Sequence, residues 1–425
     1  METICSVFHG RNDSVAADLN SRYTAPAKST HYMSRFDPNP AAYQRPIVIP
    51  KSKRLSAIKI IALIVASLFA LLLGLIILLL IGAETGLAEL FIGMICATLP
   101  VPIYVMLLLW IDRYEAEPLW MLATSFVWGA IIAVFISLIF NTGIQIFAAV
   151  ASNSEEVGDA VGSVISAPIV EESAKALILV ILFFWKKDEF DGIVDGIVYA
   201  GMVGLGFAMT ENILYYGRAI QKGPDFLTAV WILRGIAAPF SHPLFTSMTG
   251  IGLGWARQSQ STFTKIMAPF LGFGLAILMH AAWNGSAVFG GGAGFFVTYF
   301  MVMGPALIIT LMVIHFQLKR EGRLVQQFLY PDYQKGFFDQ HEFERLCSVR
   351  GRMKMSWSAL WSHGFSGWRM RRRCNQMASE LAFHRSRVAR GFHRNAQEAA
   401  EREEEYRSTL HELRQQFAQR QQGRR

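Results

Sequence analysis

The chain has few cysteines for its length, with four among 425 residues. Cys5, Cys96, Cys347 and Cys374 show no CxxC spacing, which argues against a disulfide framework and a structural zinc site. The first residues lack the charged start, short apolar core and cleavage site of a removable signal peptide, so none is expected. No RNA-binding or DNA-binding module motif occurs, so no nucleic-acid partner is expected.

Long apolar runs dominate the sequence instead, and 52% of the residues are hydrophobic. A helix that crosses a bilayer needs about 20 consecutive apolar residues. The runs therefore predict an all-α, polytopic membrane helix bundle of about eight transmembrane helices. The expected spans are 57–81, 88–111, 120–141, 162–185, 192–216, 229–254, 266–289 and 295–317.

The loops between these spans alternate in charge. Arg113, Lys186 and Arg257 lie in loops on one side, whereas Glu84 and Glu155 lie in loops on the other. Because Lys and Arg are enriched in cytoplasmic loops, the pattern predicts a multi-pass protein of the cell membrane with both termini in the cytosol.

Composition also divides the chain into four parts. Residues 1–55 are polar and proline-containing, and we expect them to form a disordered cytosolic arm. The spans of 56–150 carry almost no polar residues and are interpreted as a scaffold. Nearly all polar residues within spans fall in 151–318, which we interpret as the functional core. Residues 319–425 form a basic cytosolic tail that we expect to be partly helical.

The tail is the main source of positive charge. The segment 318–425 holds 22 Lys and Arg residues against 12 Asp and Glu residues, and a basic segment beside a membrane favours anionic lipids. Its residues Trp357, Trp361 and Trp368 could belong to an amphipathic segment on the membrane surface. Residues 376–420 suit a helix that is solvated on most faces, or a weak coiled coil.

One expected span opens with three charged residues, Glu171, Glu172 and Lys175. A charged side chain at the centre of a membrane helix costs roughly 2.5–3.5 kcal/mol, so such residues usually serve a function. On a helix, both glutamates lie three or four residues from the lysine and can reach its ammonium. The alternative is an internal ion pair that only fixes helix packing.

The next three spans also carry polar residues. Their glycines, Gly201 and Gly204 among them, are better explained by close helix packing. Packing does not explain the polar side chains Glu211, Tyr215, Arg234, His242, His280 and Asn284. Counted along the spans, Glu171, Glu211 and His280 fall in the outer half and His242 falls near the midplane, so one cavity open to the outside could hold them.

Four short motifs in this order resemble those of PrsW-type intramembrane proteases. They are EESAK at 171–175, FAMTEN-IL-Y at 207–215, HPLFT at 242–246 and HAAWN at 280–284. This family belongs to the wider superfamily of type II CAAX prenyl proteases and bacteriocin-processing membrane proteins. The resemblance covers about 160–290, so 151–318 is expected to be a PrsW-like protease core.

The resemblance implies hydrolysis of a peptide bond within or near the membrane. By that resemblance Glu171 is the general base that activates water, with Glu172 beside it. His242 and His280 would orient the water or bind a metal, and Asn284 could stabilise the oxyanion. Glu211 would be a third metal ligand or a structural partner. The supporting residues are Lys175, Tyr215, whose hydroxyl could orient Glu211, and Arg234.

The metal question stays open at this point. Two neutral imidazoles, His242 and His280, together with Glu211 would suit zinc and leave a position open for water. The same groups could also work without a metal. The sequence lacks the HExxH motif of zinc site-2 enzymes, the GxSG loop of serine enzymes and the GxGD motif of aspartyl enzymes.

Two further functional hypotheses remain. A polytopic transporter or proton-coupled carrier could use the Glu/His cluster as a relay, although no inverted repeat is visible. The chain could also be an inactive scaffold that keeps the fold. By the family resemblance, the substrate would be a single-span membrane protein cut near the outer surface, in the manner of site-1 cleavage of an anti-sigma factor. The oligomeric state is not indicated.

Overall fold

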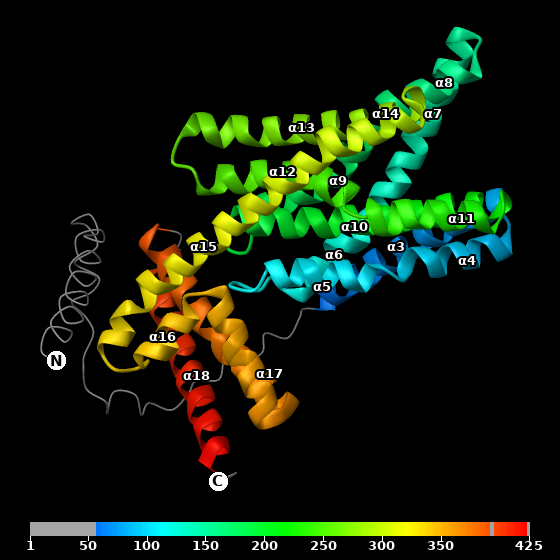
Figure 1. Cartoon of the computed structure of the whole chain (residues 1–425). Coiled ribbons are helices and arrows are strands. Elements are labelled where there is room, and N and C mark those ends of the chain that lie inside the picture. The colour runs from blue at the N-terminus through cyan, green and yellow to red at the C-terminus, as the bar shows by residue number, and fades with distance from the viewer. Residues whose placement is uncertain (1–56, 392–394, 423–425) are drawn as a thin grey trace, which may run out of the picture.

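The computed structural model describes residues 57–391 and 395–422, and these residues form helices with no strand among them. The expected arm at 1–55 lies outside the described residues. The chain runs back and forth through a helix bundle, with a helical tail at one end (Figure 1). The first half of the bundle consists of α3 (Ala57–Thr85), α4 (Leu87–Thr98), α5 (Val101–Ile111), α6 (Leu119–Val127), the π-helix η2 (Trp128–Ala133), α7 (Val134–Ser152) and α8 (Glu155–Val161).

The second half of the bundle contains the polar spans. It consists of the π-helix η3 (Gly162–Ser166), α9 (Ala167–Trp185), α10 (Ile193–Gln221), α11 (Pro224–Trp231), the π-helix η4 (Ile232–Ala237), α12 (Ser241–Gln258), α13 (Thr262–Phe289), α14 (Gly291–Thr298), the π-helix η5 (Tyr299–Met303) and α15 (Gly304–Gln334). Helix α15 continues past 319, so the expected start of the tail falls inside a helix.

Six helical stretches of the described residues are long and apolar enough to cross a membrane. They are Ile60–Thr85, Leu87–Ile111, Leu119–Ser152, Ile193–Gln221, Thr262–Phe289 and Gly291–Gln334. The other two expected spans are not among the six: 162–185 is helical but carries three charged residues, and 229–254 is interrupted at 238–240 and carries polar residues of the core. The all-α polytopic bundle expected from the sequence is confirmed.

Helix α10 lies at the centre of the bundle. In its most apolar window, 94% of the residues are buried, against 17% for the first span. Small residues let α12 approach it closely: a Cβ on Gly196 would lie 2.1 Å from the backbone oxygen of Gly250, and a Cβ on Gly204 would lie 2.6 Å from the nitrogen of Pro243. The packing role expected for the glycines of this span therefore fits their contacts.

The expectation of one continuous helix over 229–254 is wrong. The helix stops after Ala237 and resumes at Ser241, because Pro239 lacks an N–H and restricts the residue before it. Tyrosine hydroxyls cap carbonyls beside the break: Tyr104 donates to Gly235 O at 3.0 Å and Tyr299 donates to Ala237 O at 2.7 Å. Broken backbone at membrane depth needs such partners.

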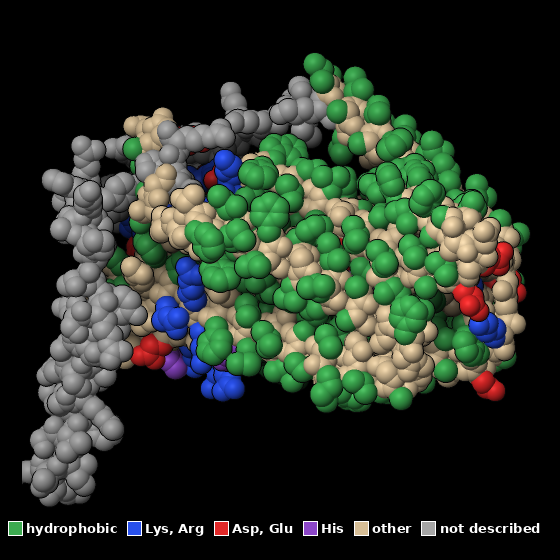
Figure 2. Space-filling model, turned by 90° about the horizontal axis from the view of Figure 1, so that it is seen from above, with side chains coloured by type: hydrophobic (Ala, Val, Ile, Leu, Met, Phe, Trp, Pro, Cys, Tyr) green, Lys and Arg blue, Asp and Glu red, His purple; other side chains and the backbone are tan. Residues whose placement is uncertain are grey.

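The two ends of the bundle differ in charge. The loops with Lys186 and Arg257 lie at the end that carries the tail, and α8 with its acidic first turn lies at the opposite end (Figure 1). Arg218 lies at the acidic end, where it pairs with Glu84 at 2.5 Å. Between the ends, the flank is covered mostly by hydrophobic side chains (Figure 2), as expected for a surface in contact with lipid.

The tail is more compact than the sequence indicates. Helices α16 (Gln340–Leu346), α17 (Val349–Ala389) and α18 (Ala396–Gln422) share one hydrophobic cluster with Tyr114 and Ile193 of the bundle. Arg387 pairs with Glu115, and Arg390 pairs with Asp191 at 2.8 Å. The expectation of a mostly solvated helix over 376–420 fits α18, whose buried residues among those described are Ala399, Glu403 and Leu410, but it is wrong for 376–389, where Leu381 and its neighbours are buried.

Candidate active site

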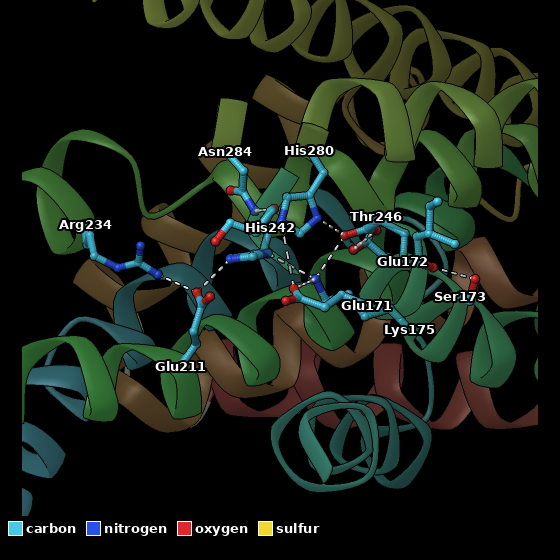
Figure 3. Close-up of polar contacts among 12 residues, drawn as sticks. Glu171, Glu172, Ser173, Lys175, Glu211, Arg234, His242, Thr246, His280 and Asn284 are labelled. Carbon is cyan, nitrogen blue, oxygen red and sulfur yellow. Dashed lines mark hydrogen bonds and ion pairs between the residues drawn. The ribbon is translucent and has the colours of Figure 1, made fainter. Parts of the chain in front are cut away.

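Four helices bring the expected polar residues together inside the bundle (Figure 3). Helix α9 carries Glu171, Glu172 and Lys175, and α10, α12 and α13 supply the remaining groups of the cluster. Glu171, Glu172, Lys175, His242 and His280 are all buried. Residues far apart in the sequence therefore form one buried polar cluster.

Lys175 occupies the middle of this cluster and is fully buried. Its Nζ lies 3.3 Å from Glu171 Oε2, 2.9 Å from Glu172 Oε1 and 3.0 Å from Nδ1 of His242. The ammonium also lies 3.7 Å from the centre of the Phe207 ring. The lysine thus supplies positive charge that offsets two buried carboxylates.

The two adjacent glutamates have different surroundings. Glu172 is held on both oxygens: Oε1 contacts Lys175 and His280 Nδ1, the latter at 3.1 Å, and Oε2 accepts from Thr246 at 3.0 Å. Within the described part of the chain, Glu171 has Lys175 as its one hydrogen-bond donor. Glu171 is therefore the carboxylate with capacity left for another partner.

The two histidines are each oriented by a carboxylate. His280 Nδ1 faces Glu172, which leaves its Nε2 directed toward Glu171 Oε2 at 3.8 Å. That separation is too long for a hydrogen bond, but one water molecule or ion can contact both atoms. His242 Nε2 lies 2.9 Å from Glu211 Oε2, and its ring lies 5.1 Å from that of His280.

Glu211 lies at the accessible side of the cluster. It pairs with Arg234 from η4, and the two side chains are 21% and 19% exposed, whereas that of Lys175 is 0% exposed. The Arg234 guanidinium stacks over the Tyr215 ring at 3.8 Å. The carboxylate is thus oriented by Arg234 and His242, and no hydrogen bond from Tyr215 to Glu211 occurs among the described residues.

Asn284 has a structural partner. Its Nδ2 donates at 2.8 Å to the carbonyl of Ser163, which lies in the π-helix η3. In a π-helix that carbonyl would accept from residue 168, but Pro168 has no N–H. One N–H of the Asn284 amide therefore replaces a missing backbone bond, and the amide keeps a second N–H.

Sequence reasoning missed two contributors to the site. Thr246 lies within the HPLFT motif and donates to Glu172, and Phe207 opens the FAMTEN motif and lies against Lys175. It also missed the break that brings His242 to the second position of α12. Pro239, three residues before His242, was the available signal.

A metal ion would find suitable ligands here. Atoms of Glu171, His242 and His280 all lie within 4.8 Å of one another, and this is the one such group found among the described residues. The pairing of His280 with Glu172 also matches the carboxylate–histidine arrangement that orients metal-binding imidazoles. Glu211, expected as a ligand, lies outside this group, which Glu171 joins instead.

These observations define a polytopic membrane protein with a buried cluster of glutamates and histidines suited to hydrolysis. The model of the PrsW family of intramembrane metalloproteases matches residues 117–310. A protease PrsW of Bacillus subtilis is 31% identical over 178 residues, which cover 41% of this chain and 72% of that protein. The chain therefore belongs to the PrsW family of intramembrane proteases.

Other relatives give the same result. A protease PrsW of Oceanobacillus iheyensis is 28% identical over 204 residues, covering 48% of this chain and 84% of the relative. One from Geobacillus kaustophilus is 36% identical over 146 residues, covering 34% and 58%. No solved structure matches the chain. The family membership confirms the resemblance found in the motifs and does not favour the transporter alternative.

Proposed function

We propose that the protein hydrolyses a peptide bond of a membrane-anchored protein near the outer membrane surface, with Glu171 as the general base. The observation that carries this proposal is the buried cluster in which Glu171, His242 and His280 offer ligand atoms within 4.8 Å of one another. A base, an oriented imidazole pair and a sheltered environment are the elements that peptide hydrolysis needs.

Glu171 fits the role of base better than Glu172. The oxygens of Glu172 are engaged by Lys175, Thr246 and His280, so this residue positions its neighbours. Glu171 can accept a proton from a water molecule placed between its Oε2 and His280 Nε2. As the water oxygen attacks the carbonyl carbon, the proton passes through Glu171 to the leaving nitrogen and the C–N bond breaks.

The remaining groups orient and stabilise. His242 is held between Lys175 and Glu211, so its ring is fixed beside the reacting centre. The second N–H of Asn284 can donate to the oxyanion that develops on the substrate carbonyl. Arg234 and Glu211, which are partly exposed, mark the side from which substrate enters.

The donor set also fits zinc. Glu171, His242 and His280 would hold the ion, and Glu171 would then serve as a ligand in place of its role as the free base. A bound zinc would act as a Lewis acid that polarises the carbonyl and acidifies a water molecule. Lys175 contacts both Glu171 and His242, so it competes with the ion for these two groups and keeps the site close to neutral without it.

The side of cleavage follows from the charges of the bundle. We assign the basic end, with the tail, to the cytosol, which puts both termini on that side. Glu211 lies ten residues before α10 ends at Gln221, and His280 lies nine residues before α13 ends at Phe289. Both ends lie on the acidic, outer side, which suits a cut just outside the span of a single-span protein such as an anti-sigma factor.

Membrane proteomics tests this proposal. New protein N-termini are mapped in cells with the wild type, with Glu171→Ala, or with Glu84→Ala as an exposed control at the same end of the bundle. We expect termini a few residues outside the span of a single-span protein, present with the wild type and control and absent with Glu171→Ala. Termini on the cytosolic side, or no difference between the strains, would reject the proposal.

A further inference from the structure

Helix α17 is a hairpin of two antiparallel arms, 349–363 and 365–389. The chain turns at Gly364, whose φ of 68° and ψ of −167° interrupt the helix. The buried guanidinium of Arg352 joins the arms by donating to Ser379 and, at 2.8 Å, to the Asn375 carbonyl. Asn375 also donates to Ser356 across the hairpin at 3.3 Å. These bonds between the arms therefore hold the turn at a fixed distance from the base of the hairpin, where residues 349 and 389 lie.

The turn end of this hairpin exposes large hydrophobic side chains. Met353, Trp357 and Trp361 follow one another at four-residue spacing, which puts them on one face of the first arm, and Phe365 follows directly after the turn at Gly364. Trp361 is 85% exposed and Phe365 is 67% exposed. Among the described residues after Tyr330, these four are the exposed large hydrophobic side chains. The rest of the tail buries its large hydrophobic groups, so this stripe needs a partner.

The charge around the stripe is of one sign. No acidic residue occurs between Glu344 and Glu380, whereas eight Lys and Arg residues do. Of these, Arg352 and Arg371 are buried inside the hairpin. Arg345 is half-buried, and the exposed ones are Arg350, Lys354, Arg369, Arg372 and Arg373. A hydrophobic stripe bordered by positive charge alone complements a surface that is apolar inside and anionic outside.

The base of the hairpin is fixed to the end of a membrane span. Tyr114 follows α5 by three residues, donates from its hydroxyl to the Cys347 carbonyl at 3.3 Å and lies under the Arg352 guanidinium at 4.7 Å. In Figure 1, α17 slants away from α16 at an oblique angle to the spanning helices, and its free tip lies beside the tail end of the bundle. An arm of 349–363 is roughly 20 Å long, so the turn lies within reach of the bilayer surface.

We propose that the turn of α17 inserts into the lipid leaflet at the tail end of the bundle, with its arginines on anionic phospholipid headgroups. Tryptophan favours the interface between headgroups and hydrocarbon, and Trp361 and Phe365 occupy the turn. Basic residues near an anionic surface each strengthen the attraction by roughly fivefold. The hairpin thereby fixes the tail, and the loop 112–118 to which it is attached, at the membrane surface.

The test uses the full-length protein in vesicles. A fluorophore is attached at Phe365→Cys or, as a control on α18, at Glu404→Cys, after replacement of the four native cysteines by alanine. Vesicles are made of phosphatidylcholine alone or with phosphatidylglycerol, and each set carries a spin-labelled lipid that quenches nearby fluorophores. We expect quenching at position 365 to exceed that at 404 several-fold, and to increase with phosphatidylglycerol.

Charge variants separate headgroup binding from loss of folding. Arg372→Glu with Arg373→Glu should reduce the quenching at 365 at least about tenfold in anionic vesicles, whereas Lys at both positions should preserve it. Equal quenching at 365 and 404, or no effect of the glutamates, would overturn the proposal. If a second, spin-labelled copy of the chain quenches the fluorophore at 365 and spin-labelled lipid does not, the proposal is also overturned, because the stripe would then be a protein interface.

Discussion

Replacement of Lys175 by methionine should strongly destabilise the protein. The ammonium is fully buried and contacts Glu171, Glu172 and His242 at 3.3, 2.9 and 3.0 Å. Removal of one partner of a buried ion pair leaves an uncompensated charge and costs about 3–5 kcal/mol. Methionine has a similar length, so lost packing adds little to this cost.

A double-mutant cycle isolates the electrostatic part. Lys175→Met combined with Glu172→Gln should recover part of the loss, because the double variant no longer buries the carboxylate of Glu172, whereas the carboxylate of Glu171 still lacks its lysine partner. The matched control is the pair Arg218 and Glu84, whose side chains are 50% and 48% exposed. Replacement of either control residue should cost only about 0.2–1 kcal/mol.

The assay is reversible unfolding in mixed micelles, followed by tryptophan fluorescence. Each free energy of unfolding is measured for the wild type, the single variants and the double variants under the same conditions. A loss below about 1 kcal/mol for Lys175→Met, similar to that of the exposed control, would refute the reasoning. It would mean that Lys175 does not neutralise the cluster.

Three further predictions concern packing, pH and metal. Gly204→Ala should lower the free energy of unfolding by about 1–3 kcal/mol and reduce activity, because the added Cβ would lie 2.6 Å from the nitrogen of Pro243, next to His242. The control Gly143→Ala, where a Cβ would have no atom within 4 Å, should change neither stability nor activity. Burial raises the pKa of Asp112 well above its usual range, so its contribution to stability is present below about pH 4 and is lost as pH rises through the higher, folded-state pKa. In thermal unfolding, Asp112→Asn should therefore stabilise the protein at about pH 8 and leave its stability unchanged at about pH 4. The expected gain is about 1.4 kcal/mol for each pH unit between the folded-state pKa and the unfolded-state pKa of Asp112. A gain in stability at both pH values would contradict this prediction. Elemental analysis should find about one zinc per chain in the wild type and none in His280→Ala, and a chelator should abolish cleavage; full activity without metal would contradict a zinc role.

The bundle could largely be predicted from its hydrophobic runs. Length and composition alone identify spans such as 57–81 and 266–289, and both are helical here. The break at Pro239 was missed, because a hydrophobic run gives no weight to a single proline. The packing of the tail on Tyr114 was also missed, because it depends on contacts between segments more than 200 residues apart.

The sequence predicted which residues form the site but not which contacts they make with one another across helices. Helical spacing predicted that Lys175 reaches both neighbouring glutamates, and both contacts are present. Spacing along one helix cannot reveal how α9 meets α12 and α13, so the unequal surroundings of Glu171 and Glu172 emerged only from the fold. The contact between Asn284 and Ser163 likewise depends on the π-helix at η3, which the sequence did not predict.

The most direct test of the central claim compares cleavage by purified wild type, Glu171→Gln and Glu172→Gln. All three are assayed in the same micelles on the single-span substrate found by terminus mapping, with equilibrium unfolding measured in parallel. Loss of a general base typically reduces the rate by about 10²–10⁴-fold. We expect that loss for Glu171→Gln with unfolding close to wild type, and for Glu172→Gln a loss of activity together with a loss of stability. Cleavage by Glu171→Gln within about tenfold of the wild-type rate would contradict the assignment of Glu171 as the base.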